Sequence, residues 1–115
     1  MEYDNQNIFA KILRKEIPCD LFFESIHTVI IKDIAPQAKT HLLVIPKKSY
    51  IDLYDFNKNA SDNEIVDFWK ALNKVIEENN LSDCSFNVKS HRGKNGGQVV
   101  FHFHVHLLSD HKPLA

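Results

Sequence analysis

Three features of the sequence predict a single α+β domain with an antiparallel sheet whose helices cover one face. The chain has 115 residues, about the size of one domain and enough for one independent core. Helix-like and strand-like segments follow each other in the order helix, strands, long helix, strands, which is typical of α+β proteins. Near the C-terminus, apolar residues alternate with histidines, which indicates a strand with one core face.

The first third of the chain is predicted to contain a short helix followed by two strands. Residues 7–15 carry apolar residues at a helical spacing, and Pro18 prevents the helix from continuing. The apolar face consists of Ile8, Phe9, Ile12 and Leu13. Residues 21–24 and 28–32 are short runs with aromatic or β-branched residues, which favour strands.

The middle of the chain is predicted to contain a turn, a strand, the longest helix and another strand. Residues 33–39 should form the turn, and residues 41–45 and 85–89 the strands. Ser61 or Asp62 is expected to cap the long helix. The apolar positions of that helix follow a 3.6-residue period and are all expected to face the core: Ile65, Phe68, Trp69, Leu72, Val75 and Ile76.

A final strand is predicted for residues 98–108, QVVFHFHVHLL. The even positions hold His102, His104 and His106, whereas the odd positions hold apolar residues. A strand puts all three imidazoles on one face, and a helix would separate His104 from the other two. We therefore expect the histidines to lie on the face of the sheet that the helices leave uncovered.

Composition narrows the possible partners and the compartment. A net charge of −1 gives no electrostatic reason to expect nucleic acid or an anionic membrane as a partner. No apolar stretch approaches the length needed to cross a bilayer, and the polar N-terminus is unlike a signal peptide. Cys19 and Cys84 are interpreted as free thiols. These features predict a cytoplasmic protein made of one domain, residues 1–115.

The alternating histidines have three interpretations. They could be half-buried structural residues, although each imidazole then needs its own polar partner. They could bind a metal ion, but the outer Cα atoms would lie roughly 13 Å apart, so a ligand such as His41 would have to complete the site. They could serve nucleophilic catalysis, in which one imidazole attacks phosphorus while its neighbours fix its tautomer and donate to phosphate oxygens.

The distribution of glycine favours the catalytic interpretation. All three glycines lie between residues 93 and 97, directly before the histidines. A glycine-rich loop lets backbone amides approach phosphate oxygens, although a turn between two strands would also explain it. The loop lacks the ending of a P-loop. Together with the histidines it predicts a phosphate-binding site.

Several segments resemble the histidine triad (HIT) superfamily, and in particular its Hint branch of nucleotide-binding, purine nucleoside phosphoramidase-like proteins. They are NIFAKILRKEIP at 7–18, DIAPQAKTHLLVIPKK at 33–48, GGQ at 96–98 and HFHVHLL at 102–108. The resemblance implies a HIT-like fold, with a five-stranded antiparallel sheet and two helices on one face, and a homodimer. It implies hydrolysis of purine nucleoside phosphoramidates, such as amides of AMP, through a nucleotidyl-histidine intermediate.

The resemblance also implies roles for four histidines. His104 would be the nucleophile, and His106 would donate to a phosphate oxygen. His102 would orient His104, in part through its backbone carbonyl, and His41 would support the triad from the adjacent strand. No cofactor is implied. A structural zinc ion, which some members hold with N-terminal cysteines, is not expected, because Asn7 and Ala10 stand at the corresponding positions.

Substrate-binding residues follow from the same resemblance. Asp33 would accept from the ribose hydroxyls, and backbone amides near Gly97 would stabilise phosphoryl charge. The purine slot would be lined by Phe9, Ile12, Ile31 and Ile34. His91 stands where the branch usually has an asparagine, and Val99 where a serine is frequent. The tail at 109–115 lacks the Gly-Gly and tryptophan of the animal proteins, which leaves the leaving-group preference open.

Two other functions stay possible at this stage. Dinucleoside polyphosphate hydrolysis is typical of another HIT branch, although the Hint-like N-terminal half argues against it. A purine-nucleotide-binding regulator with weak catalysis is the second possibility, since Val99 replaces a hydroxyl donor.

Overall fold

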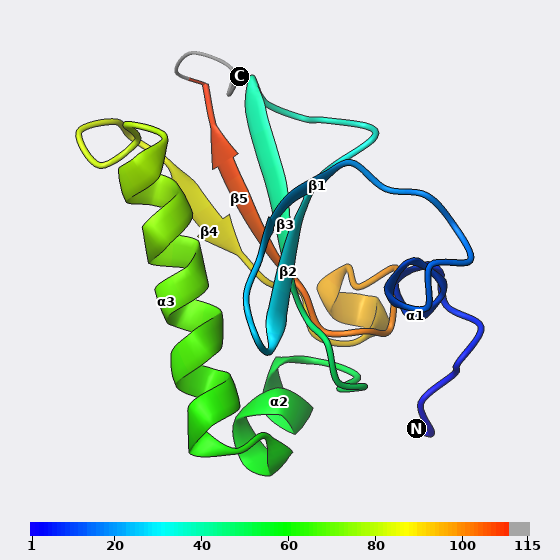
Figure 1. The fold of residues 1–115 in the computed structure, drawn as a ribbon. Helices are drawn as coiled ribbons and strands as arrows, with labels where there is room; N and C mark the ends of the chain where they lie inside the picture. The colour runs from blue at the N-terminus through cyan, green and yellow to red at the C-terminus, as the bar shows by residue number, and fades with distance from the viewer. Residues whose placement is uncertain (111–115) are drawn as a thin grey trace.

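The computed structural model describes residues 1–110, and its centre is one five-stranded antiparallel sheet (Figure 1). The strands are β1 (Leu21–Glu24), β2 (Thr28–Lys32), β3 (Thr40–Pro46), β4 (Asn87–Lys89) and β5 (Val105–Ser109), in the spatial order β1-β2-β3-β5-β4. The helices are α1 (Ile8–Leu13), α2 (Leu53–Asn59), α3 (Asp62–Glu78) and a 3₁₀ turn, η1 (Lys94–Gly96). The predicted α+β class and antiparallel sheet are confirmed. Residues 111–115, with most of the predicted tail, lie outside the described part.

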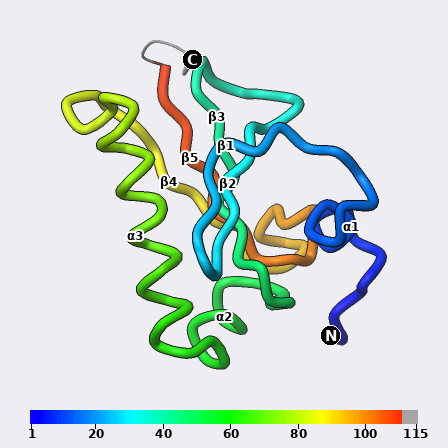
Figure 2. Tube along the Cα trace, viewed as in Figure 1, coloured from blue at the N-terminus to red at the C-terminus, as the bar shows by residue number. Residues whose placement is uncertain are grey.

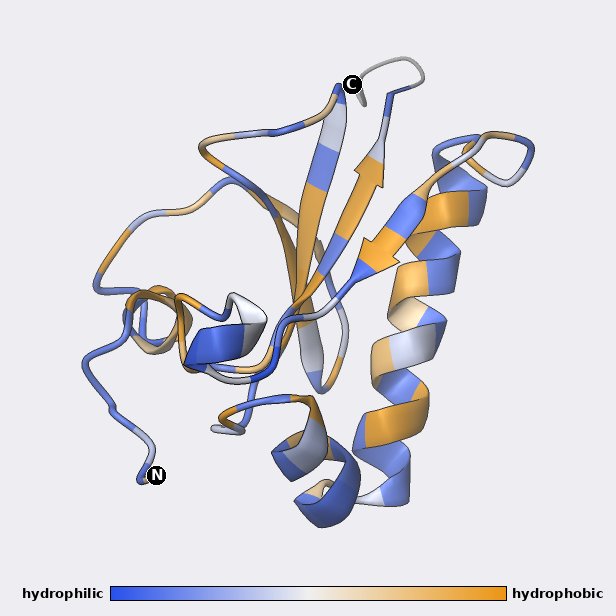
Figure 3. Cartoon of the chain, turned by 180° about the vertical axis from the view of Figure 1, so that it is seen from behind, coloured by the Kyte–Doolittle hydropathy of each residue, from blue (hydrophilic) through white to orange (hydrophobic). Residues whose placement is uncertain are grey.

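The main core lies between one face of the sheet and helices α2 and α3. Alternate residues of β2, β3 and β5 face this side, and aromatic residues of the two helices and of the segment before β5 meet them. Its buried members include Ile30, Leu42, Val44, Phe56, Phe68, Phe103, Val105 and Leu107. Figure 3 shows the hydrophobic residues concentrated on the sheet and in bands along α3. The central strand β3 is buried along its whole length, which fits its position between two covered faces.

Helix α1 covers the opposite face, so the expectation that helices occupy only one face is wrong. Phe9 packs with residues of β2 and β3 whose side chains point away from α3. This second cluster contains Phe9, Val29, Ile31, Leu43 and Ile45, with Ile12 and Leu13 at its edge. His41 and His106 have the same strand parity as these residues, so the histidine side of the sheet is the α1 side.

Helix boundaries differ from the prediction for local reasons. α1 stops at Leu13 because Lys15 adopts a left-handed conformation, with φ of 65°, that closes the helix end. α2 is too short for a periodic pattern, although Asp52 caps it by accepting from the amide of Asp55. Ser61 caps α3 as predicted and forms a capping box with Glu64. Trp69, expected in the core, lies at its rim with 39% of its surface exposed.

The histidine run is only partly a strand. β5 begins at Val105, so His106 is in regular structure while His102 and His104 precede it. The irregular segment 98–104 is held by contacts with distant parts of the chain, such as the 2.7 Å hydrogen bond from the Phe103 amide to the Tyr50 carbonyl. In Figure 2 this segment passes close to α1 before it enters the sheet. β4 is likewise shorter than predicted, with three residues.

None of the helices in residues 1–110 is long and apolar enough to span a membrane.

Asp67 joins α3 to the turn between β1 and β2. One carboxylate oxygen accepts from the hydroxyls of Ser25 and Thr28, at 2.6 and 2.8 Å, and from the amide of His27 at 3.0 Å. Thr28 is fully buried, so loss of the acceptor would leave its hydroxyl without compensation from water.

We therefore expect Asp67→Ala to lower the free energy of unfolding by about 1–3 kcal/mol. Lys70→Ala, an exposed site on the same helix, should change it by less than about 0.5 kcal/mol. Urea denaturation of the three proteins measures both values. Equal stability of the two variants would contradict a stabilising role for the Asp67 contacts.

Candidate active site

The histidines lie at a cleft of about 330 Å³ on the α1 side of the sheet. Five parts of the chain contribute to its walls: α1, the turn before β3, β3 itself, the segment from β4 through the glycine loop, and β5. The lining residues include Phe9, Asp33, Lys89, His91, Gly97, Val99, His104 and His106. Seven of the residues predicted for the site thus line one cleft: all of these except Lys89, which sequence reasoning missed.

His104 presents one free ring nitrogen to the cleft. Its Nδ1 lies 2.7 Å from the backbone carbonyl of His102. A carbonyl oxygen only accepts, so Nδ1 carries the hydrogen and Nε2 of the neutral ring is unprotonated. The ring packs edge-on against Phe9, with centroids 4.8 Å apart. His104 therefore combines a fixed tautomer with a basic nitrogen that no described residue occupies.

His102 is fully buried and lies behind His104. Its Nε2 donates to the Pro46 carbonyl at 2.8 Å, and its Nδ1 lies 2.5 Å from the Tyr3 hydroxyl. Both ring nitrogens are thus satisfied inside the protein. The predicted orienting role through the backbone carbonyl agrees with this geometry, whereas direct contact with a ligand does not.

His106 and His41 form a second chain of hydrogen bonds. The Gln37 amide donates to His41 Nδ1 at 3.1 Å, and His41 Nε2 lies 2.9 Å from His106 Nδ1. Because His41 Nδ1 accepts, Nε2 of the neutral ring must be the donor to His106. His106 then carries its remaining hydrogen on Nε2. This makes it a donor beside His104, with ring centroids 5.1 Å apart.

Burial keeps these imidazoles neutral. Desolvation is the main cause that lowers the pKa of His102 to about 4 and that of His106 to about 4. It also lowers the pKa of His104, although the hydrogen bond to the His102 carbonyl opposes the shift, and that of His41, where Asp33 opposes it. At neutral pH the cluster therefore offers a neutral nucleophile and neutral donors.

The glycine loop forms the wall that faces the triad. Gly97 has φ of +91°, and a Cβ there would lie 3.4 Å from the ring of His91. The same His91 ring meets His106 edge-on at 5.6 Å between centroids. The Gly97 amide donates to the Lys94 carbonyl within the loop, so it is already used. The Val99 amide has no acceptor among the described residues, and the Val99 side chain is 86% exposed.

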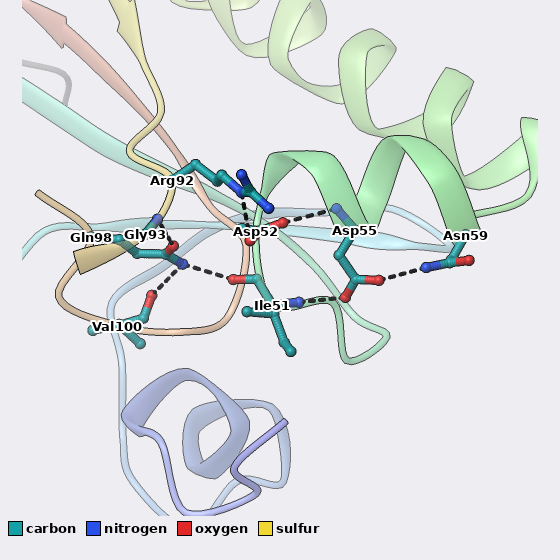
Figure 4. Close-up of polar contacts among 8 residues, drawn as sticks. All are labelled: Ile51, Asp52, Asp55, Asn59, Arg92, Gly93, Gln98 and Val100. Atoms are coloured by element: carbon teal, nitrogen blue, oxygen red, sulfur yellow. Dashed lines mark hydrogen bonds and ion pairs between the residues drawn. The ribbon is translucent and has the colours of Figure 1, made fainter. Parts of the chain in front are cut away.

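Gln98 anchors this loop from behind (Figure 4). Its buried side chain accepts from the Gly93 amide at 2.8 Å and donates to the carbonyls of Ile51 and Val100 at 2.7 and 3.0 Å. The Arg92 side chain forms an ion pair with Asp52, the N-cap of α2, with 3.2 Å between Arg92 Nε and Asp52 Oδ2. These contacts connect the cleft wall to α2.

The residues predicted for the purine slot lie in different places. Phe9 lines the cleft, whereas Ile12 and Ile31 line a neighbouring groove of about 260 Å³. The two depressions share a floor, since Phe9, Ile31 and Leu43 belong to one apolar cluster. Ile34 is 89% exposed in the turn before β3 and lines neither depression.

One group of side chains has the composition of a metal site. Potential ligand atoms of Asp33, His41 and His106 all lie within 4.8 Å of one another. However, His41 Nε2 and His106 Nδ1 face each other in a hydrogen bond, with Asp33 Oδ2 3.4 Å from His41 Nε2. An ion would have to replace the hydrogen bond between His41 and His106, which fixes the His106 tautomer. The present geometry therefore suits proton donation by His106 better than it suits metal binding.

Sequence reasoning missed three residues of the site. Lys89 lies opposite His106 in the β4–β5 register and therefore points to the same face. Its strand was predicted, but the register was needed to place the side chain. Gln37 acts through a backbone amide, and Tyr3 lies 99 residues from His102 in the chain, so no local pattern could reveal either contact.

Known proteins match this sequence and fold over nearly the whole chain. Residues 14–113 match the model of the HIT domain. An uncharacterised HIT-like protein of Rickettsia prowazekii is 37% identical over 96% of this chain and 92% of its own. The purine nucleoside phosphoramidase of Escherichia coli K12 is 31% identical over 96% of this chain and 91% of its own. A HIT family hydrolase from Clostridium thermocellum superposes with a TM-score of 0.83 at 33% identity, covering 96% of each chain. The chain belongs to the HIT family.

Proposed function

We propose that this protein hydrolyses purine nucleoside phosphoramidates, such as amides of AMP, through a nucleotidyl-histidine intermediate on His104. The geometry of His104 carries the proposal: its Nδ1–H is bound to the His102 carbonyl, which leaves Nε2 as a neutral nucleophile in a cleft of about 330 Å³. The 31% identity to the E. coli enzyme of that name supports the substrate class.

The proposed reaction has two displacements. Nε2 of His104 attacks the α-phosphorus, the P–N bond to the leaving amine breaks, and the amine departs with a proton that we assign to the imidazolium form of His91, which becomes neutral. Water then attacks the phosphorus, the Nε2–P bond breaks, and nucleoside monophosphate is released. The proton that water loses restores His91, and His104 is neutral again. His106 Nε2–H and the Val99 amide would donate to the phosphoryl oxygens. These two hydrogen bonds would stabilise the negative charge of the transition state without a metal ion or cofactor.

The nucleoside would extend from the phosphate toward α1. Asp33 lines the cleft as well and would accept from the ribose hydroxyls. The base would lie on the apolar floor formed by Phe9 and Leu43, with Ile12 and Ile31 of the adjoining groove as its outer neighbours. An apolar floor does not by itself select adenine over guanine, so we propose purines as a class.

A second candidate is hydrolysis of dinucleoside polyphosphates. Lys89 lies opposite His106 and lines the cleft, and no described acidic residue forms an ion pair with it. A cation at this place would attract an anionic polyphosphate leaving group. The two substrate classes are distinguished by comparing their kcat/KM values under the same conditions.

We also propose a cytoplasmic homodimer. β4 is an edge strand of the sheet, and it carries the exposed Val88, with the exposed Phe86 directly before it. An unpaired edge next to exposed apolar side chains is suited to pairing with a second copy.

The first test is hydrolysis of a fluorogenic adenosine phosphoramidate by chelator-treated protein. His104→Ala should lower kcat by about 10⁴-fold or more, because the nucleophile is removed. His27→Ala, outside the cleft, should keep full activity. Turnover of the His104 variant at the wild-type rate would refute the covalent mechanism. If the wild type binds nucleotide but does not turn the substrate over, a role as a purine-nucleotide-binding regulator would be favoured instead.

The pH dependence tests the nucleophile's protonation state. Protonated His104 cannot attack, so activity is present above its pKa and is lost as pH falls through it. Burial lowers that pKa, so with an arylamine leaving group, which needs little protonation by His91, kcat/KM should stay near its plateau at pH 6.5 and fall only in more acidic solution. Steady-state rates across the acid range, in buffers of constant ionic strength, locate the midpoint. A midpoint above pH 6.5 would contradict a desolvated nucleophile.

His91 is tested through the leaving group. His91→Ala should lower kcat by about 10²-fold with an alkylamine leaving group, which needs protonation, and much less with a good arylamine leaving group. His91→Asn, which restores the common family residue, should not rescue the alkylamine substrate if proton donation is required. Lys94→Ala, in the same loop, is the control. Unchanged turnover of His91→Ala with both substrates would remove this residue from the mechanism.

A further inference from the structure

The N-terminal segment contacts the triad at its most buried member. The Tyr3 hydroxyl lies 2.5 Å from Nδ1 of His102, and the two rings meet edge-on with centroids 5.6 Å apart. Tyr3 does not line the cleft, and His102 has no exposed surface. A contact between residues 99 positions apart, made on the histidine that holds the nucleophile, calls for a role other than substrate binding.

The direction of this hydrogen bond follows from the other partner of His102. The Pro46 carbonyl can only accept, so His102 Nε2 carries the hydrogen. In the neutral ring Nδ1 is then a bare acceptor, and the Tyr3 hydroxyl must be the donor. Tyr3 and Pro46 together hold the ring at both nitrogens and specify one tautomer.

One backbone hydrogen bond supports the peptide group that follows His102, since the Phe103 amide donates to the Tyr50 carbonyl at 2.7 Å. Residues 98–104 are outside regular structure, and no strand ladder fixes their carbonyls. The His102 carbonyl nevertheless has to point at Nδ1 of His104 to keep the nucleophile in its productive tautomer. The side-chain anchors act together with this hydrogen bond in place of a ladder: the His102 ring is held at both nitrogens and the Phe103 amide is bound, so the peptide group between the two residues has a fixed direction.

We propose that Tyr3 is a positioning residue, whose hydroxyl fixes His102 so that its backbone carbonyl orients the nucleophile His104. The catalytic consequence rests on the proposed function, whereas the effect on the His102 ring does not. Removing the hydroxyl leaves a buried nitrogen without a donor, which loosens the ring and permits the other tautomer.

The experiment separates the hydroxyl from the aromatic ring. Tyr3→Phe keeps the packing surface and deletes the donor, and Tyr54→Phe is the matched control. The Tyr54 ring contacts Lys58 and Arg92 through its face, outside the cleft, and Phe preserves both contacts. The first readout is long-range ¹H–¹⁵N NMR of the imidazoles at neutral pH. In Tyr3→Phe the Nδ1 resonance of His102 should move toward that of an unbonded acceptor nitrogen, and in Tyr54→Phe it should not move.

The second readout is steady-state hydrolysis of the adenosine phosphoramidate. Tyr3→Phe should lower kcat by about tenfold, the effect of one buried hydrogen bond, and leave KM within about twofold. A residue that only adds stability would lower the melting temperature and leave kcat and the His102 resonance unchanged below it; that result would overturn the proposal. A shifted resonance with unchanged kcat would also overturn it. If the wild type has no turnover, the proposed function fails while the NMR comparison still tests the contact.

Discussion

The proposed chemistry of this protein depends on the 2.7 Å hydrogen bond from His104 Nδ1 to the backbone carbonyl of His102. A carbonyl oxygen cannot donate, so this bond determines the tautomer of His104 whatever the substrate is. The rest of the site can be understood as support for it. His102 is buried and held at both ring nitrogens, Phe9 packs against the rings of both histidines, and His106 stands beside the free nitrogen as a donor.

Burial has a second consequence, because it prevents neighbouring imidazoles from carrying charge together. The rings of His41, His106 and His104 follow one another at about 5 Å, a spacing at which several positive charges would repel strongly in a poorly solvated cleft. Desolvation lowers the pKa of each of these three histidines, and so the cluster is neutral at neutral pH. The same neutrality allows each ring to be a donor at one nitrogen and an acceptor at the other, which builds directed chains. Charged rings would have only donors and could not form them.

The sequence specified the sheet well and the site only in part, for reasons that differ between residues. β1 and β2 occupy their predicted ranges because β-branched and aromatic runs with clear boundaries are local signals. The strand predicted over 98–108 fails at its first half, since the period-two pattern describes side-chain alternation but not whether a partner strand is present. The family resemblance named His104 and His106, which line the cleft. The roles of Tyr3 and Lys89 in the site could not be predicted from the sequence. The contact of Tyr3 with His102 spans 99 residues, and the position of Lys89 beside His106 depends on the strand register.

The two sides of the cleft are built by different means. In the proposed reaction, one side would determine the reactivity of His104 and the other the selectivity for the leaving group. On the side of His104, the side chains of Tyr3 and His41 and the backbone carbonyls of Pro46 and His102 hold the imidazoles through internal hydrogen bonds. A substitution there would change the proposed nucleophile itself. On the side where the leaving group would lie, His91 and Val99 stand at the surface on a loop that Gln98 and the α2 cap hold from behind, and Lys89 stands at the surface at the end of β4. Their side chains contribute little to the core and are free to vary while the loop backbone stays in place. The asparagine and serine that are common in the family are replaced at two of these positions by His91 and Val99. In the proposed reaction, the wall that would meet the leaving group is therefore the part of the site that departs from the family pattern.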